Sequence, residues 1–157
     1  MEQRLDWLKA APGVPKALFG LQSAINESGL ELPLLELVKM RASQINGCAY
    51  CLDMHSKDAR AAGETEQRLY LLGAWREAPM YTERERAALA WTEAVTCLDE
   101  GHVPDDVYAA ARAHFSEQEL ADLTLAVVAI NGWNRLAIAF RSPAGSYRPA
   151  RAVSAGT

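Results

Sequence analysis

The sequence has only three cysteines and three histidines in 157 residues. Three cysteines are too few, and odd in number, for the disulfide framework of a small secreted domain, so any disulfide should be transient and chemical. An unbroken run of the ~20 apolar residues that span a bilayer is also missing. The least polar stretch, residues 120–140, is interrupted by Asp122, Asn131, Asn134 and Arg135. We therefore expect no transmembrane helix and no membrane partner.

Positively charged residues are also fewer than negatively charged ones. The 16 Lys and Arg residues are outnumbered by 20 Asp and Glu residues, which gives a formal net charge of -4. A field of this sign repels polyanions and argues against a nucleic acid partner. The first fifteen residues alternate charged and apolar side chains and lack the continuous apolar segment of a secretory signal. We expect a cytoplasmic protein.

Alternating strand patterns and β-branched runs are absent, whereas helix start and stop signals recur along the whole chain. With 50% hydrophobic and 23% charged residues, a chain of this length has the composition of one globular domain. We predict an all-α, single-domain bundle of about six to eight helices over residues 1–142. A C-terminal tail over residues 143–157 is expected to be disordered or to pack on a neighbouring subunit. The predicted helices are a short one ending near Pro12 and then residues 15–29, 33–46, 48–63, 65–77, 83–99, 105–115 and 117–140.

The predicted helix over residues 33–46 is apolar around most of its circumference, which indicates a central place in the fold. Glu36 lies on this helix among apolar neighbours, and a carboxylate in such surroundings needs a partner. The turn predicted at Asn46-Gly47 can bring Glu36 back toward His55.

The residues that carry chemistry follow this turn in the pattern C-x-x-C-x-x-x-H. Cys48, Cys51 and His55 are three and four residues apart, so one helix presents both sulfurs and the imidazole on the same face. The cysteines fall in or beside the first turn, where free N–H groups and the helix dipole favour thiolate over thiol. His55, one turn after Cys51, can take its proton, so we predict that Cys51 attacks and Cys48 resolves.

Other interpretations of these residues remain open at this point. Cys48, Cys51 and His55 with Glu36 also form a conceivable zinc set, although a second local ligand pair is missing. The cysteine pair can also be structural. Cys97, which lies in an apolar helical context, is expected to be a small buried residue without a role. The two remaining histidines, His102 and His114, are expected on the surface.

The run ELVKMRASQINGCAYCLDMH over residues 36–55 resembles the core motif of AhpD-like alkylhydroperoxidases in the carboxymuconolactone decarboxylase superfamily. The motif has a glutamate twelve residues before the first cysteine and then C-x-x-C-x-x-x-H. The likeness extends through residues 75–77 and 81–89 to the segment 131–135, and so covers about residues 30–142. It implies an all-helical subunit that forms homo-oligomers, often trimers or hexamers, with a thiol peroxidase site.

Carried over by position, Cys51 resembles the peroxidatic cysteine, Cys48 the resolving cysteine, and His55 with Glu36 the proton relay. The sequence departs from the best-studied branch of the family at Tyr50, where that branch has a second histidine. A phenol with an ordinary pKa near 10 cannot replace an imidazole as a base at neutral pH, although it can donate a hydrogen bond.

The resemblance therefore predicts an enzyme, a thiol-dependent peroxidase that reduces organic hydroperoxides and serves an antioxidant role. We expect no bound cofactor and no metal, because the chain has no nucleotide, haem or flavin motif, so the electrons must come from an external dithiol, a thioredoxin-like protein or a lipoyl group. Two alternatives are a non-catalytic redox-sensing or stress-response module that uses the same cysteines and a carboxymuconolactone decarboxylase-like enzyme. The decarboxylases of this superfamily generally do not depend on a C-x-x-C pair.

Overall fold

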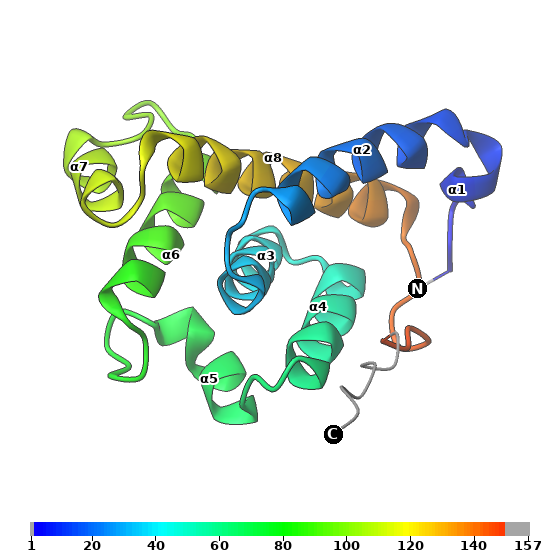
Figure 1. The fold of residues 1–157 in the computed structure, drawn as a ribbon. Coiled ribbons are helices and arrows are strands. Elements are labelled where there is room, and N and C mark those ends of the chain that lie inside the picture. Colours follow the sequence, from blue (N-terminus) through cyan, green and yellow to red (C-terminus); the bar gives the residue numbers. More distant parts are fainter. Residues whose placement is uncertain (1, 150–157) are drawn as a thin grey trace, which may run out of the picture.

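The central element of the fold is helix α3 (Leu32–Asn46), which Figure 1 shows nearly end-on with other helices around it. The structure is a computed structural model that describes residues 2–149. Within these residues the chain forms eight α-helices and one short 3-10 helix and contains no strand, which confirms the predicted all-α class. The other elements are α1 (Trp7–Ala10), α2 (Gly13–Glu27), α4 (Ala49–Ala61), α5 (Glu66–Leu71), η1 (Leu72–Ala74), α6 (Glu83–Thr96), α7 (Asp105–His114) and α8 (Glu117–Phe140).

Helix α3 packs against α4, α6 and α8, while α2 lies along α8 (Figure 1). All its residues from Leu34 to Met40 are buried, including the two charged ones. The predicted central position of this helix is confirmed. Its surroundings explain why an apolar circumference was needed, since a helix with neighbours on several sides has no solvent-facing stripe.

Helix α8 is long and apolar enough, by length and composition alone, to cross a membrane. It nevertheless packs against α2, α3, α6 and α4 within the bundle. Its buried side includes Leu123, Val127 and Ile130. A helix that packs inside a helical bundle passes the same test of length and composition as a membrane span, so the test alone does not make α8 one.

Two capping boxes set the first residues of α6 and α8. In the first box the Thr82 hydroxyl accepts from the Glu85 N–H at 3.2 Å, and the Glu85 carboxylate accepts from the Thr82 N–H at 2.8 Å. Ser116 and Glu119 repeat this pattern at the start of α8. Each box satisfies backbone donors that a helix start would otherwise leave without partners.

Replacing Thr82 by alanine is expected to lower the free energy of unfolding by about 1 kcal/mol, because one of these donors loses its acceptor. For a chain of this size that corresponds to a fall in Tm of about 2–4 °C. Thermal unfolding followed by circular dichroism measures it. Ser23→Ala is the control, since Ser23 is exposed in the middle of α2 and its removal should change stability by less than about 0.5 kcal/mol. Equal Tm values for the two variants would contradict the assigned capping role.

The prediction of one helix over residues 65–77 was wrong in its second half. The α-helix ends at Leu71, and the chain tightens into the 3-10 turn Leu72–Ala74, which contains Gly73. In a 3-10 helix the side chains at i and i+3 eclipse each other, so Leu72 and Trp75 both enter the core. The indole N–H of Trp75 then donates to Glu93 on α6 at 2.8 Å.

The two ends of the described chain meet beside α4 and α8 (Figure 1). Near the N-terminus, the Arg4 N–H donates to the Phe140 carbonyl at 3.0 Å, and the Trp7 indole donates to Ser142 Oγ at 3.3 Å. On the other side, the Gly145 N–H donates to Asp53 Oδ2 of α4 at 2.9 Å. Residues 143–149 therefore pack on α4 of the same chain. The rest of the predicted tail, residues 150–157, lies outside the described residues.

Candidate active site

The turn between α3 and α4 places the two cysteines. Helix α3 ends at Gly47, whose φ of 67° lies in the left-handed region that glycine adopts without steric cost. The next residue, Cys48, donates its N–H back to the Ser43 carbonyl at 3.0 Å and serves as the N-cap of α4. Its Sγ accepts from the backbone N–H of Cys51 at 3.4 Å. The first cysteine thus occupies the position usually taken by a serine or aspartate cap.

The Cys48 and Cys51 sulfurs lie 2.7 Å apart as free thiols, and both side chains are buried. The hydrogen bond between the two sulfurs is the main influence that lowers the pKa of Cys48, to about 7, against the opposing effect of burial. The same hydrogen bond, together with burial, raises the pKa of Cys51. The pair therefore loses one proton near neutral pH, and the charge that remains rests on the N-cap sulfur in the resting state.

His55, one turn beyond Cys51 on α4, is also buried and is joined to α3. Its Nδ1 lies 2.9 Å from Glu36 Oε2, as the predicted chain reversal required. The second carboxylate oxygen, Oε1, accepts from Lys39 Nζ at 2.8 Å. Burial alone would raise the pKa of Glu36, but the hydrogen bonds and charges of His55 and Lys39 outweigh it and leave that pKa below its ordinary value. Glu36 is thus an ionised buried carboxylate between an imidazole and an ammonium.

In the neutral form of the His55 ring that donates Nδ1–H to the Glu36 carboxylate, the Nε2 lone pair is free to accept a proton. This is the tautomer that a general base beside a thiol needs. The carboxylate also stabilises the imidazolium that forms after proton uptake.

A pocket of about 500 Å³ opens onto these groups. Cys51, His55, Glu36 and Lys39 line it, whereas Cys48 does not. Most of the remaining wall is apolar, and it includes Trp7, Leu8, Phe19, Met54, Ile130 and Trp133. Of the two sulfurs, it is Cys51 that a ligand in this pocket can touch.

Tyr50, the residue between the two cysteines that departs from the expected motif, lies half-buried on the pocket wall. Burial and the negative charges of the cysteines and Asp53 raise its pKa. A phenol that holds its proton more tightly than usual is no base at neutral pH. The structure leaves His55 as the imidazole of this site.

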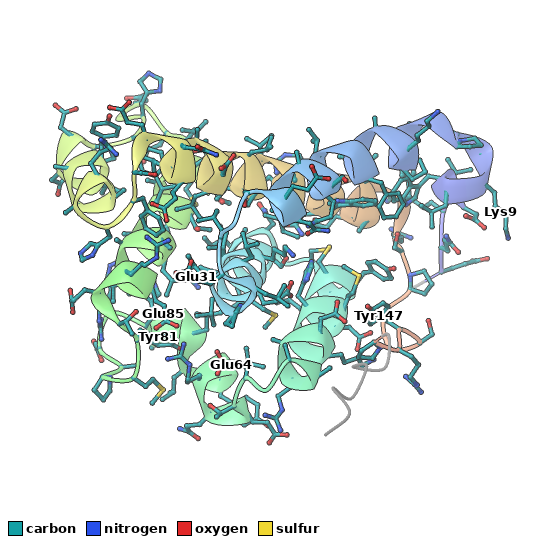
Figure 2. The ribbon with its side chains drawn as sticks, viewed as in Figure 1. Lys9, Glu31, Glu64, Tyr81, Glu85 and Tyr147 are labelled. Atoms are coloured by element: carbon teal, nitrogen blue, oxygen red, sulfur yellow. The ribbon has the colours of Figure 1, made fainter. Side chains whose placement is uncertain are left out.

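The C-terminal segment closes one side of the pocket. The Tyr147 hydroxyl donates to Asp58 Oδ1 on α4 at 2.8 Å, and Figure 2 shows Tyr147 beside that helix. Burial and the Asp58 carboxylate raise the pKa of Tyr147 to about 12, so the hydroxyl keeps its proton. Pro143 and Ser146 contribute directly to the wall.

The donor atoms that lie close enough together to bind a metal differ from the zinc set that the sequence suggested. Within residues 2–149, the donors that lie together are those of Glu36, His55 and Asp58, with ligand atoms within 4.8 Å of one another. However, one oxygen of Glu36 accepts from His55 and the other from Lys39. An ammonium 2.8 Å from a ligand oxygen opposes a cation there, so these residues fit a proton relay better than a metal site.

The structure brings the four residues predicted for the site together as two contacts, Cys48 with Cys51 and Glu36 with His55, and three of them, Glu36, Cys51 and His55, line one pocket. Lys39 was not predicted, although it stands three residues after Glu36 and therefore on the same helix face. Site residues farther along the chain had no such local spacing by which the sequence could reveal them.

The prediction that Cys97 is buried was wrong, since it is the exposed C-cap residue of α6. Helix α6 ends at Thr96, so Cys97 no longer follows the buried side of the helix. His102 and His114 are exposed, as predicted.

The chain is similar to known proteins in sequence and in fold. Residues 12–94 match the Carboxymuconolactone decarboxylase family. The uncharacterized protein YdfG of Bacillus subtilis is 42% identical over 146 residues, which cover 93% of this chain and 99% of the relative. A crystal structure of a protein of unknown function from Agrobacterium tumefaciens, proposed to be the antioxidant defence protein AhpD, is 46% identical with a TM-score of 0.89, covering 93% of this chain and all of that chain. An alkylhydroperoxidase AhpD core from Ralstonia eutropha, an uncharacterized peroxidase-related protein, shares the fold with a TM-score of 0.77 at 22% identity, over 88% of this chain and 74% of that one.

Proposed function

Because the chain belongs to the carboxymuconolactone decarboxylase family and has an AhpD-like fold, we propose that it is a thiol peroxidase that reduces organic hydroperoxides in antioxidant defence. The observation that carries the proposal is the reduced Cys48–Cys51 pair, with sulfurs 2.7 Å apart, at the wall of a largely apolar pocket shared with His55. Family and fold support an enzyme of some kind, and this pair points to peroxide chemistry.

The cycle starts with proton transfer. One of the two thiol protons passes to His55 Nε2, and Glu36 stabilises the imidazolium. The other proton lies between the two sulfurs. When it sits on Cys48, the negative charge is on Cys51, the sulfur that faces the pocket.

The Cys51 thiolate then attacks the outer oxygen of the hydroperoxide and the O–O bond breaks. Cys51 is oxidised to a sulfenic acid, and the alkoxide leaves with the proton that His55 returns to it. The Cys48 thiol condenses with the sulfenic acid, which forms the Cys48–Cys51 disulfide and releases water. In balance, two thiols and one hydroperoxide give one disulfide, one alcohol and one water.

An external dithiol must reduce this disulfide, and we propose a thioredoxin-like protein, a lipoyl group or a small dithiol. Cys48 and Cys51 are each only 1% exposed. Such burial favours a reductant whose thiol enters the pocket, as a lipoyl arm or a small dithiol can. Cytoplasmic location and a trimeric or hexameric assembly belong to the same proposal. Exposed apolar side chains along α8, such as Val128 and Ile138, support the assembly.

The test is the consumption of an organic hydroperoxide, such as cumene hydroperoxide, by purified protein with excess dithiothreitol. The expected result is many equivalents consumed per subunit. Cys97→Ser should behave like the unmodified protein, because Cys97 lies outside the pocket and its removal leaves only the paired cysteines.

Other outcomes would favour the alternatives. One equivalent consumed, followed by a stable disulfide in the presence of dithiothreitol, would favour a redox sensor. No consumption and no disulfide would turn attention to a decarboxylase-like reaction.

A further inference from the structure

Asn134 is a fully buried amide on α8 that the peroxidase cycle above does not use. It lies on α8 between Ile130 and Ala137, which pack in one buried cluster with Cys48 and Cys51, so it stands beside the pair, and the pKa of each of these cysteines responds to it. An amide has one accepting end and one donating end. Which end faces the sulfurs decides whether Asn134 opposes or stabilises a thiolate.

The orientation is set by a chain of hydrogen bonds that begins at Asn131. Its Nδ2 donates to the Val127 carbonyl at 2.9 Å and to Thr96 Oγ1 at 3.0 Å. Its Oδ1 accepts from Arg135 Nη1 at 2.8 Å. A backbone carbonyl only accepts and a guanidinium only donates, so the Asn131 amide cannot be turned the other way.

Asn46, at the end of α3, transmits this orientation to Asn134. Its Nδ2 lies 2.9 Å from Asn131 Oδ1 and 2.9 Å from Asn134 Oδ1, so it donates to both. With its oxygen engaged, Asn134 donates from Nδ2 to Ser43 Oγ at 3.0 Å. The Ser43 carbonyl accepts the Cys48 N–H at 3.0 Å, so the donating end of the amide lies on the side of the cysteines. Its second N–H is available to a sulfur.

The pKa shifts of the two cysteines agree with this orientation of the Asn134 amide. The hydrogen bond between the two sulfurs is the largest influence that lowers the pKa of Cys48, and Asn134 lowers it further. For Cys51, whose pKa is raised by Cys48 and by burial, Asn134 acts in the opposite direction. The same donor therefore favours the charged form of either sulfur.

We infer that Asn134 donates a hydrogen bond to the thiolate of the Cys48–Cys51 pair, on whichever sulfur carries the charge, and that Asn46 and Asn131 hold it in the donating orientation. The catalytic meaning of this role rests on the proposed peroxidase function. A donor that reaches both sulfurs lets the charge move from Cys48 to Cys51 without loss of its hydrogen bond.

The other titratable groups near the pair lie on α3 and α4. They are Tyr50 and His55 on α4 and, one layer farther, Glu36 and Lys39 on α3. The residues of α8 that line the pocket are uncharged. Asn134 is thus the polar contribution of α8 to the dithiol.

The experiment measures the thiolate directly, by absorbance at 240 nm against pH, in the reduced Cys97→Ser protein, so that only the paired cysteines titrate. Asn134→Leu removes the donor at similar volume. The expected result is a rise of about one unit in the midpoint of the first ionisation, which is roughly a tenfold loss of thiolate well below the midpoint. Asn46→Ala should shift the midpoint in the same direction, although Asn46 does not contact sulfur, because Asn134 loses the donor that orients it.

Thr92→Val is the matched control. Thr92 is as deeply buried as Asn134, and its hydroxyl donates to the Ala88 carbonyl away from the cysteines. It should leave the midpoint unchanged. A folded Asn134→Leu protein with the midpoint of the parent would overturn the inference. If the Asn134→Leu protein does not fold, Asn46→Ala tests the inference instead. An unchanged midpoint in that variant would overturn it as well. Because the titration needs no peroxide, a failure of peroxidase activity leaves this result readable.

Discussion

Replacing Cys51 by serine is expected to abolish peroxide turnover, with a fall in kcat/KM of about 10⁴-fold or more, as is typical for loss of a catalytic nucleophile. A serine hydroxyl is not ionised at neutral pH, and among the described residues Cys51 is the one thiol that lines the pocket, since Cys48 is not part of its wall. Hydroperoxide consumption in the presence of dithiothreitol measures the effect.

Cys48→Ser is the matched variant, and it should behave differently. The Cys51 sulfur still meets the peroxide, so the first equivalent reacts, but the sulfenic acid has no partner with which to form a disulfide. We expect over-oxidation to sulfinic acid, visible by mass spectrometry as two added oxygens on Cys51. The reverse result, with Cys48→Ser inert and Cys51→Ser over-oxidised, would exchange the two roles. That outcome would mean that the resting thiolate on Cys48 is itself the nucleophile.

Replacing Glu36 by glutamine should cost both stability and activity. The change leaves the buried Lys39 ammonium without its carboxylate and removes the charge that stabilises protonated His55. Breaking a buried ion pair on one side typically lowers the free energy of unfolding by about 3–5 kcal/mol. Loss of a working general acid–base lowers kcat by about 10²–10⁴-fold. Urea unfolding and steady-state kinetics measure the two effects.

Glu31→Gln is the control for the charge change. Glu31, which Figure 2 labels, is exposed and pairs with Arg84. A salt bridge at the surface is worth about 0–1 kcal/mol. Equal stabilities of the Glu36→Gln and Glu31→Gln proteins would contradict the buried relay.

The difference in unfolding free energy between the unmodified protein and the Glu36→Gln protein is also expected to depend on pH. The pKa of this carboxyl is lower in the folded protein than its ordinary value of 4.5, so the unfolded chain binds the proton first as the pH falls. The stabilisation is therefore complete above about pH 5 and is lost as the pH drops through the folded pKa. The Glu36→Gln protein lacks this acid-side loss. The difference in unfolding free energy between the two proteins should shrink below about pH 4.5, measured by urea unfolding at successive pH values.

Local sequence signals predicted most of the helices, because the start and the apolar spacing of a helix depend on residues close together in the sequence. The span of α8 and both capping boxes follow from residues within one or two turns of each other. The predictions that failed concern places where a helix ends for reasons outside its own periodicity. Gly73 sits where the chain tightens to bring Trp75 into contact with α6, and Cys97 leaves the helix pattern one residue after Thr96.

The sequence by itself determined how Cys48, Cys51 and His55 lie relative to one another, because 3.6 residues per turn puts the residues of C-x-x-C-x-x-x-H on one helix face. Only the tertiary structure decided which sulfur faces the pocket, that Lys39 shares the Glu36 carboxylate, and that α8 packs Asn134 and its neighbours beside the dithiol. The acidity of a buried thiol depends on donors and charges within a few ångströms in space. Those that come from another helix have no fixed spacing in the sequence, so packing alone places them.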